Sequence, residues 1–286
     1  MTRIKAVWTI LLLSIVSIVL IPPQWLAVKS GHPVQRRLPH FWHRAATRLV
    51  GIRVREIGRP ETSRPLLIAA NHASWVDITV VGSLMPLSFI AKSEVAGWPV
   101  FGLFAKLQRT VFVNRQRRSD TGKVTNAIAE RMAEGDAMVL FAEGTSNDGN
   151  CVLPFRSALL GAATRSGGED QDVWVQPLSV AYHSLHGLPM GRQFRPHVAW
   201  YGDMELAGHL WGIFRDGALD VVVTWGEPVR VTSQTDRKAL TRQVEAEVRR
   251  LTMASLRAGV NEVSVSAENP AAELFSSAEK TAKAGA

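Results

Sequence analysis

The residues most suited to chemistry lie in the stretch Asn-His-Ala-Ser-Trp-Val-Asp, which directly follows the apolar run Leu66–Ala70. His72 and Asp77 are of the types that serve as a general base and the carboxylate that orients it. Five residues along a regular helix rotate a side chain by about 500°, so the two would not share a helix face. They can meet only if His72 lies in the turn before a helix and folds back over the first residues of that helix.

A helix cap is the structural alternative for the same stretch. Ser74 and Asp77 have the spacing of a capping box, in which the two side chains satisfy free N–H groups at the start of a helix. That alternative explains Ser74 and Asp77 but gives Asn71 and His72 no role. Both arrangements can hold together, with Ser74 as the cap and Asp77 as the partner of the imidazole.

A histidine held by a carboxylate can activate a hydroxyl or a thiol. The sequence contains no Gly-x-Ser-x-Gly motif, and we find no plausible pairing of Cys151, its single cysteine, with a histidine. We therefore expect the substrate to supply the nucleophile. A substrate hydroxyl that attacks an activated acyl group fits this arrangement.

Polar residues also follow two other apolar runs. Glu143, Gly144 and Thr145 come after Ala137–Phe141, and Gly144 permits a close backbone approach while hydroxyl and N–H groups there could hold an anion. Arg115 comes after Thr110–Val113 and could bind a phosphate or a carboxylate. The next arginines, at positions 117 and 118, are expected in a solvated loop.

Short apolar runs alternate with helical patterns, which predicts a mostly parallel sheet with helices on its faces, an α/β fold. The strands are expected at Leu66–Ala70, Leu87–Ala91, Thr110–Val113, Ala137–Phe141, Val173–Tyr182 and Val221–Trp225. Helices are expected over residues 76–85, over 121–135 with Gly135 closing the helix, and over 235–257. A single amphipathic helix is expected over Ser30–Arg55. Residues 183–216 show no clear strand and could form a lid, a membrane-facing loop or ordinary packing; His183 and His186 there are expected to be structural rather than metal ligands.

The first 29 residues predict a membrane anchor. The chain is almost uninterruptedly apolar from Ala6 to Ile21 and again after Pro22-Pro23-Gln24, which is close to the length of a spanning helix. A cleaved signal peptide is disfavoured because no small-residue cleavage site follows; a single spanning helix and a half-buried hairpin stay open. Positive charges are more numerous after this segment than before it, which favours the cytoplasmic side of the membrane for the main domain.

The net charge of the chain and the composition of its last residues predict the partners and the domain boundaries. The net charge is +8 and no nucleic-acid-binding motif is present, so the charge favours an anionic membrane surface or an anionic substrate. We expect one domain over residues 30–258. Residues 259–286 are rich in Ala, Ser, Glu and Lys and are expected to form a disordered tail.

Four blocks of the sequence resemble the glycerolipid acyltransferases, the family of 1-acyl-glycerol-3-phosphate acyltransferase. The blocks are Asn-His-Ala-Ser-Trp-Val-Asp, Val-Phe-Val-Asn-Arg, Phe-Ala-Glu-Gly-Thr and Val-Gln-Pro-Leu-Ser-Val-Ala-Tyr, in this order between residues 71 and 182. Ala142 stands where the family usually has proline, and Ala158 where it often has glycine.

The resemblance implies a role for each matching residue. His72 would be the base that activates the acceptor hydroxyl, and Asp77 would hold the imidazole. Arg115, Glu143, Gly144 and Thr145 would bind the polar head of the acceptor. The acyl donor would be acyl-CoA or acyl-carrier protein, with no other cofactor, no metal and no covalent acyl-enzyme.

The flanking segments resemble a narrower group, the bacterial lyso-ornithine lipid O-acyltransferases, at residues 38–44, 91–102 and 198–212. This resemblance implies transfer to a hydroxyl of lyso-ornithine lipid, with transfer to lysophosphatidate as an additional or alternative activity. A non-catalytic lipid-binding protein of the same fold, and a hydrolase that uses His72 with water, are the other hypotheses. The paired His72 and Asp77 argue against the first, and the expected exclusion of water argues against the second.

Overall fold

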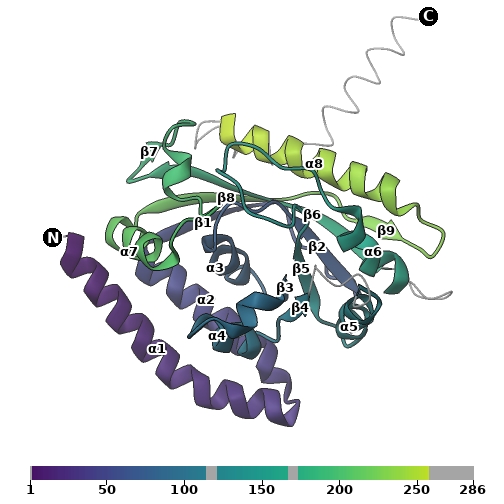
Figure 1. Ribbon diagram of the computed structural model, residues 1–286, viewed down its shortest axis with the longest axis horizontal. Helices are drawn as coiled ribbons and strands as arrows, with labels where there is room; N and C mark the ends of the chain where they lie inside the picture. Colours follow the sequence, from purple (N-terminus) through teal and green to yellow (C-terminus); the bar gives the residue numbers. More distant parts are fainter. Residues whose placement is uncertain (1, 114–120, 167–172, 258–286) are drawn as a thin grey trace, which may run out of the picture.

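A mixed sheet forms the centre of the computed structural model, which describes residues 2–113, 121–166 and 173–257 (Figure 1). Its main strands lie in the order β1-β8-β6-β2-β5-β3-β4, and β7 and β9 pair with β6. The strands are β1 Ile52–Ile57, β2 Leu66–Ala70, β3 Ser88–Lys92, β4 Val111–Val113, β5 Ala137–Phe141, β6 Val173–Leu185, β7 Leu188–Pro189, β8 Leu219–Trp225 and β9 Val229–Val231. The pairs β1–β8, β2–β5, β2–β6, β3–β4 and β3–β5 are parallel, whereas β6 pairs with β7, β8 and β9 antiparallel. The predicted α/β fold with a mostly parallel sheet is confirmed.

Helices cover both faces of this sheet (Figure 1). The α-helices are α1 Thr2–Ser30, α2 Arg37–Val50, α3 Val76–Gly82, α4 Phe101–Leu107, α5 Thr121–Ala133, α6 Ser157–Ser166, α7 Leu206–Asp216 and α8 Arg237–Arg257. Short 3-10 helices are η1 Pro33–Arg36, η2 Ser93–Gly97 and η4 Arg195–His197. One hydrophobic core joins the sheet to α2, α3 and α7, and a second joins its other face to α5, α6 and α8.

The central strands β2 and β5 alternate between these two cores, as the pleat requires. Leu66, Ile68 and Ala70 of β2 face the first core, and Leu67 and Ala69 face the second. Every residue of β2 and of β5 is buried, which explains why their sequences are continuous apolar runs. The two strands are in register, with Ala70 opposite Phe141, so both end at the same edge of the sheet.

The expectation of one helix over Ser30–Arg55 was wrong. Helix α2 ends at Val50 because Gly51 adopts the left-handed conformation that terminates helices, with φ 87°. The chain then forms the strand β1, in which Ile52 is buried and Arg53 is exposed. This change from helical to alternating periodicity was overlooked in the sequence.

The segment from His183 to Asp216 is more ordered than the sequence suggested. Strand β6 continues to Leu185, residues 188–189 form β7, and residues 206–216 form α7. Ile213 of α7 is buried in the core that also contains α2 and α3. The segment therefore includes a packed helix against the sheet.

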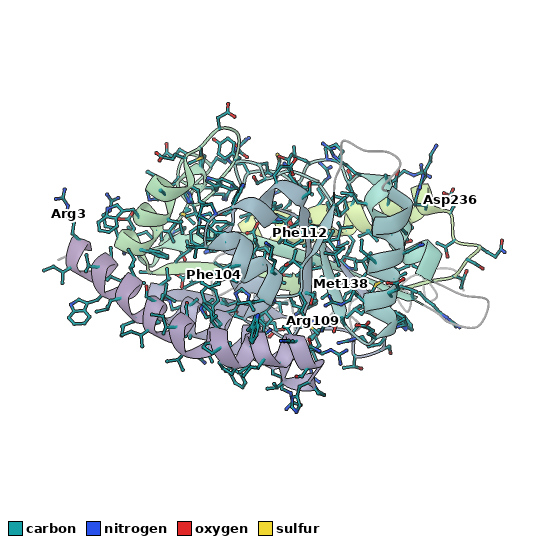
Figure 2. All side chains as sticks on the ribbon, turned by 60° about the horizontal axis from the view of Figure 1, so that its bottom comes forward. Arg3, Phe104, Arg109, Phe112, Met138 and Asp236 are labelled. Atoms are coloured by element: carbon teal, nitrogen blue, oxygen red, sulfur yellow. The ribbon has the colours of Figure 1, made fainter. Side chains whose placement is uncertain are left out.

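Helix α1 lies along the side of the molecule and packs against α2, α4 and α7 (Figures 1 and 2). It continues through Pro22 and Pro23, and residues 3–30 have the length and mean hydropathy, 2.5, of a helix that could cross a membrane. Only 17% of its most apolar window is buried, and its outer face exposes large apolar side chains that include Trp8, Ile18 and Leu26. This long apolar helix indicates membrane association.

Hydrogen bonds hold α1 to the rest of the protein near its start, its middle and its end. The Thr9 hydroxyl donates to the carbonyl of Leu49, and Trp42 Nε1 donates to Ser17 Oγ. Near the end of the helix, Gln24 Nε2 donates to the carbonyl of Leu107 at 2.6 Å. These contacts keep the whole helix beside the sheet and its covering helices.

Candidate active site

The side chain of Asn71 continues the sheet past the end of β2. Its Nδ2 donates to the carbonyl of Val180 at 2.9 Å, and its Oδ1 accepts from the Val180 N–H at 2.8 Å. The amide thereby replaces a residue of the β2–β6 ladder at the point where the backbone turns away. Asn71 thus has a structural role: it fixes the position from which His72 projects.

The structure brings His72 and Asp77 together. Nδ1 of His72 lies 2.7 Å from Oδ2 of Asp77, which also accepts from the backbone N–H groups of Ala73 at 2.8 Å and Ser74 at 3.0 Å. His72 lies in the turn before α3 and folds back over its start. Only half of the capping box is present, because Asp77 accepts from the N–H of Ser74 while the Ser74 hydroxyl faces the N–H of Val76 at 3.4 Å.

The hydrogen bonds determine which ring nitrogen of His72 carries the proton. The Asp77 carboxylate can only accept, so Nδ1 must donate, and the neutral imidazole then has its lone pair on Nε2. Within the residues that the structure describes, Nε2 has no hydrogen-bond partner. The ring stacks on Phe141 with centroids 4.1 Å apart, and the His72 side chain is 18% exposed. His72 is therefore oriented as a base that a substrate can reach.

Tyr182 completes the environment of Asp77, and sequence reasoning missed it. Its hydroxyl donates to Oδ1 of Asp77 at 2.5 Å, and the tyrosine is 3% exposed. Burial, followed by the charge of Asp77, raises the pKa of Tyr182 well above its ordinary value, so the phenol remains a donor. A buried tyrosine near the end of a predicted strand requires a hydrogen-bond partner, and this was the available signal.

Glu143 joins the loop after β5 to the loop that carries His72. Its Oε1 accepts from the backbone N–H of His72 at 2.9 Å, and its Oε2 accepts from Asn147 Nδ2 at 2.7 Å and from the N–H of Leu153 at 3.1 Å. The residue is 2% exposed, and burial raises the pKa of its carboxyl to about 7. Both oxygens therefore bind protein donors, an arrangement that favours a positioning role over direct contact with an acceptor.

Gly144 and Thr145 form the turn that follows Glu143. Gly144 has φ 76°, in the left-handed region that favours glycine, and its N–H donates to the carbonyl of Phe141. Thr145 is exposed beside it. The turn thus presents the threonine at the same sheet edge as His72. Arg115, together with the arginines at 117 and 118, lies outside the described residues, so its predicted role in binding the acceptor stays a prediction.

The segment after β7 contacts the His72 loop directly. The N–H of Trp200 donates to the carbonyl of Ala73 at 2.8 Å, and Trp75 Nε1 donates to His209 Nδ1 of α7 at 2.9 Å. On the other side, the N–H of Asn147 donates to the carbonyl of His72 at 3.2 Å. Two separate segments therefore hold the loop. Among the described residues, no group of three or more His, Cys, Asp or Glu side chains is placed to hold a metal, and His183 is buried near Ser184.

Comparisons with known proteins identify the family of this chain. The family model described as Acyltransferase matches residues 51–181, the range that contains His72, Asp77 and Glu143. A lyso-ornithine lipid O-acyltransferase of Brucella abortus is 55% identical over 243 residues, 84% of this chain and 91% of the relative, and one of Rhizobium meliloti is 44% identical over 86% of this chain and 85% of the relative. A 1-acyl-sn-glycerol-3-phosphate acyltransferase of Neisseria gonorrhoeae is 33% identical over 68% of this chain and 72% of the relative.

The fold also resembles a solved structure. The crystal structure of the 1-acyl-sn-glycerophosphate (LPA) acyltransferase from Thermotoga maritima superposes with a TM-score of 0.59 at 21% identity, over 91% of this chain and 99% of that chain. Together, the sheet, the His72–Asp77 pair at its carboxyl edge and these similarities define an O-acyltransferase. The chain belongs to the acyltransferase family whose members act on lysolipids.

Proposed function

We propose that this protein transfers a fatty acyl group from acyl-carrier protein or acyl-CoA to the hydroxyl of lyso-ornithine lipid. The single observation that carries the chemistry is the 2.7 Å contact between His72 Nδ1 and Asp77, which leaves Nε2 available as a base. The acceptor is proposed from the relatives named lyso-ornithine lipid O-acyltransferase, at 55% and 44% identity, against 33% for one named for acylglycerol phosphate. No resident cofactor or metal is needed for the reaction.

The reaction follows from the orientation of His72. Nε2 removes the proton of the acceptor hydroxyl while the hydroxyl oxygen attacks the carbonyl carbon of the acyl donor's thioester. The tetrahedral intermediate then collapses, the C–S bond breaks, and the leaving thiolate takes the proton back from the imidazolium. Asp77 stabilises the imidazolium during both steps and holds the ring in one tautomer.

The polar head of the acceptor is proposed to bind at the turn after β5. Thr145 is exposed there, and Gly144 lets the backbone turn sharply at the same sheet edge as His72. Arg115 is proposed to pair with the carboxylate of a lyso-ornithine acceptor or the phosphate of lysophosphatidate. In this proposal Glu143 acts through His72, because its hydrogen bond to the His72 N–H fixes the loop.

The membrane arrangement is proposed from α1. Its outer face exposes apolar side chains along most of its length while its inner face is hydrogen-bonded to the domain, so the helix and the sheet approach the bilayer together. We propose the bacterial inner membrane, with the domain on the cytoplasmic side, where the acyl donors are found. An anionic surface would attract the basic chain, whose net charge is +8.

The acceptor is tested by competition. Membranes carrying the protein would receive a labelled acyl donor with lyso-ornithine lipid and lysophosphatidate, separately and mixed, and His72→Ala membranes would be the control. The proposal expects His72-dependent labelling of ornithine lipid with the larger kcat/KM. His72-dependent labelling of phosphatidate alone would show that lysophosphatidate is the acceptor in place of lyso-ornithine lipid. Release of free fatty acid in the absence of an acceptor would indicate a hydrolase. If no product depends on His72, the protein is a lipid-binding protein without this activity.

A further inference from the structure

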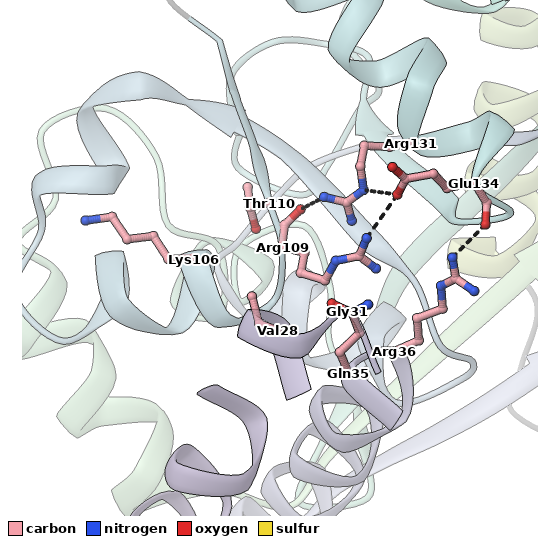
Figure 3. A pocket seen from close by; sticks show the side chains of 9 residues that line it. All are labelled: Val28, Gly31, Gln35, Arg36, Lys106, Arg109, Thr110, Arg131 and Glu134. Carbon is pink, nitrogen blue, oxygen red and sulfur yellow. Dashed lines mark hydrogen bonds and ion pairs between the residues drawn. The ribbon is translucent and has the colours of Figure 1, made fainter. Parts of the chain in front are cut away.

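A cavity of about 670 Å³ lies at the edge of the sheet opposite to His72. It is lined by the end of α1 and η1, by the end of α4 and by the end of α5 (Figure 3). Thr110, in its wall, comes just before β4, and Asp136 comes just before β5, whereas His72 and Glu143 follow the carboxyl ends of their strands. The five residues of β5 separate the two sites by roughly 16 Å, at about 3.3 Å per residue. The cavity is therefore a second site.

Cationic side chains dominate its lining. Four of the nine lining residues are basic and one is acidic: Arg36, Lys106, Arg109 and Arg131 against Glu134. Figure 3 shows the three guanidinium groups close together, whereas the side chain of Lys106 extends away from them at the other end of the lining. Even after Asp136 is counted beside them, the cluster has two more positive than negative charges. Such a surplus favours an anion.

The arginines are held in place by one buried carboxylate. Asp136, 3% exposed, binds Arg36 at 2.6 Å, Arg109 at 3.2 Å and Arg131 at 2.5 Å. Each guanidinium has five N–H donors, and the interactions found take two from Arg36, two from Arg109 and four from Arg131. Donors therefore remain on every one of these arginines for a further acceptor.

Among the three arginines, Arg109 has the least favourable surroundings and backbone conformation. Its side chain is 11% exposed, and burial, followed by the charge of Arg131, lowers the pKa of its guanidinium. Its backbone has φ 61°, in the left-handed region that residues other than glycine rarely adopt. A network that only held α5 against η1 would not require a third buried guanidinium in this conformation. A bound anion, in contrast, would stabilise the Arg109 guanidinium.

Lys106 supports a ligand most directly. Its side chain is exposed at the cavity, and it has no acidic partner among the described residues. In the part of the chain that the structure describes, the salt bridges of Asp136 and Glu134 are with the arginines. Lys106 is thus outside the structural network, and its charge is available to an incoming group.

The position of the cavity indicates which anion could reach it. Val28 and Gly31 in its wall belong to the end of α1, and Figure 2 shows Arg109 beside that end of the helix. One turn earlier, Trp25 and Leu26 are 52% and 58% exposed, and the Lys29 ammonium lies 5.1 Å from the centre of the Trp25 ring. An exposed tryptophan with a neighbouring lysine is typical of the level of lipid headgroups.

We propose that this cavity binds a phosphate group, supplied by the headgroup of an anionic membrane lipid that is neither donor nor acceptor in the reaction. Its lining includes Arg36 of η1, Arg131 of α5, Lys106 of α4 and Arg109, which follows the end of α4. The bound lipid would join these elements to the bilayer at the end of α1.

The experiment uses the full-length protein in neutral detergent micelles and measures its thermal midpoint. One arm adds phosphatidylglycerol or phosphatidylcholine at equal mole fraction, and a second adds inorganic phosphate or chloride at equal ionic strength. Lys106→Gln removes the free cation of the cavity. Lys29→Gln is the matched control, because it removes an exposed cation near the same helix end but outside the cavity. Both variants should equal the unmodified protein in phosphatidylcholine.

The proposal expects phosphatidylglycerol to raise the midpoint by about 4 °C over phosphatidylcholine. Lys106→Gln should lose at least about half of this shift, whereas Lys29→Gln should keep it. A Lys106-dependent shift with inorganic phosphate alone would support the anion site but overturn the lipid as its source. Equal responses of the two variants in every arm would overturn the site and reduce the effect to general surface charge.

Discussion

The hydroxyl of Tyr182 donates a 2.5 Å hydrogen bond to Asp77 across 105 residues of chain. The other oxygen of the same carboxylate holds His72 and two backbone N–H groups. Asp77 therefore connects the end of β6, the turn after β2 and the start of α3. The orientation of the base depends on all three elements.

Removal of the tyrosine hydroxyl should affect both stability and turnover. In Tyr182→Phe, Asp77 loses a buried donor, and we expect the free energy of unfolding to fall by about 1–3 kcal/mol. The value of kcat should fall while the KM for the acceptor stays within about twofold, because Tyr182 contacts no substrate in this account. Steady-state kinetics beside a thermal melt separate the two effects. An unchanged kcat would show that Asp77 orients His72 without Tyr182.

Asp77→Asn should cripple the reaction. The neutral amide can no longer stabilise the imidazolium that forms when Nε2 takes the proton, so we expect a loss of about 10³-fold or more in kcat. Stability should also fall, because the carboxylate accepts four hydrogen bonds. Activity measured well below the melting transition isolates the catalytic loss. Full activity in a destabilised variant would leave Asp77 as a helix cap alone.

Glu143 should make stability depend on pH near neutrality. Burial raises the pKa of its carboxyl to about 7 from 4.5, so the folded state binds this proton more tightly than the unfolded state. The stabilisation is present in full below about pH 4.5 and is lost as the pH rises through 7, by about 3 kcal/mol in all. Melts of the unmodified protein and Glu143→Gln between pH 5 and 8 test this. The stability of the unmodified protein relative to Glu143→Gln should fall as the pH rises from 5 to 8. If the stabilities of the two proteins change in parallel with pH, the pKa of Glu143 is not raised.

Thr145 should affect acceptor binding without affecting the fold. Because the residue is exposed, Thr145→Val should melt normally, while the KM for the acceptor rises several-fold and kcat changes little. Arg115→Ala is expected to change KM in the same direction. Kinetics with the acceptor varied at saturating donor would measure both. An unchanged KM in either variant would remove that residue from the proposed acceptor site.

Local sequence signals were sufficient for the parts of the fold with one clear periodicity. Strands β2 and β5 begin and end where their apolar runs predicted, and the buried stripe Leu240, Val244, Val248 and Leu251 of α8 matches the predicted helix. The boundary at Gly51 was overlooked because the basic and apolar residues on its two sides fit a helix almost as well as a strand. Helix α7 was missed because its Trp, His and Gly content is unusual for a helix.

The site was predictable only in part, for a physical reason. The contact of His72 with Asp77 spans five residues and follows from a turn before a helix. The contacts of Glu143 with the His72 N–H, and of Tyr182 with Asp77, join residues 71 and 105 positions apart. Such pairs depend on strand order, which places β2 between β5 and β6. No local pattern in the sequence determines that order.

The most direct test of the account is the rate of acyl transfer by His72→Gln. The glutamine side chain is polar and of similar reach but cannot act as a base, and the position is partly exposed, so the variant should melt within about 2 °C of the unmodified protein. With labelled donor and lyso-ornithine lipid, we expect a loss of about 10²- to 10⁴-fold in kcat, the usual contribution of a general base. Transfer by the folded variant at a rate within about threefold of the unmodified protein would contradict His72 as the base.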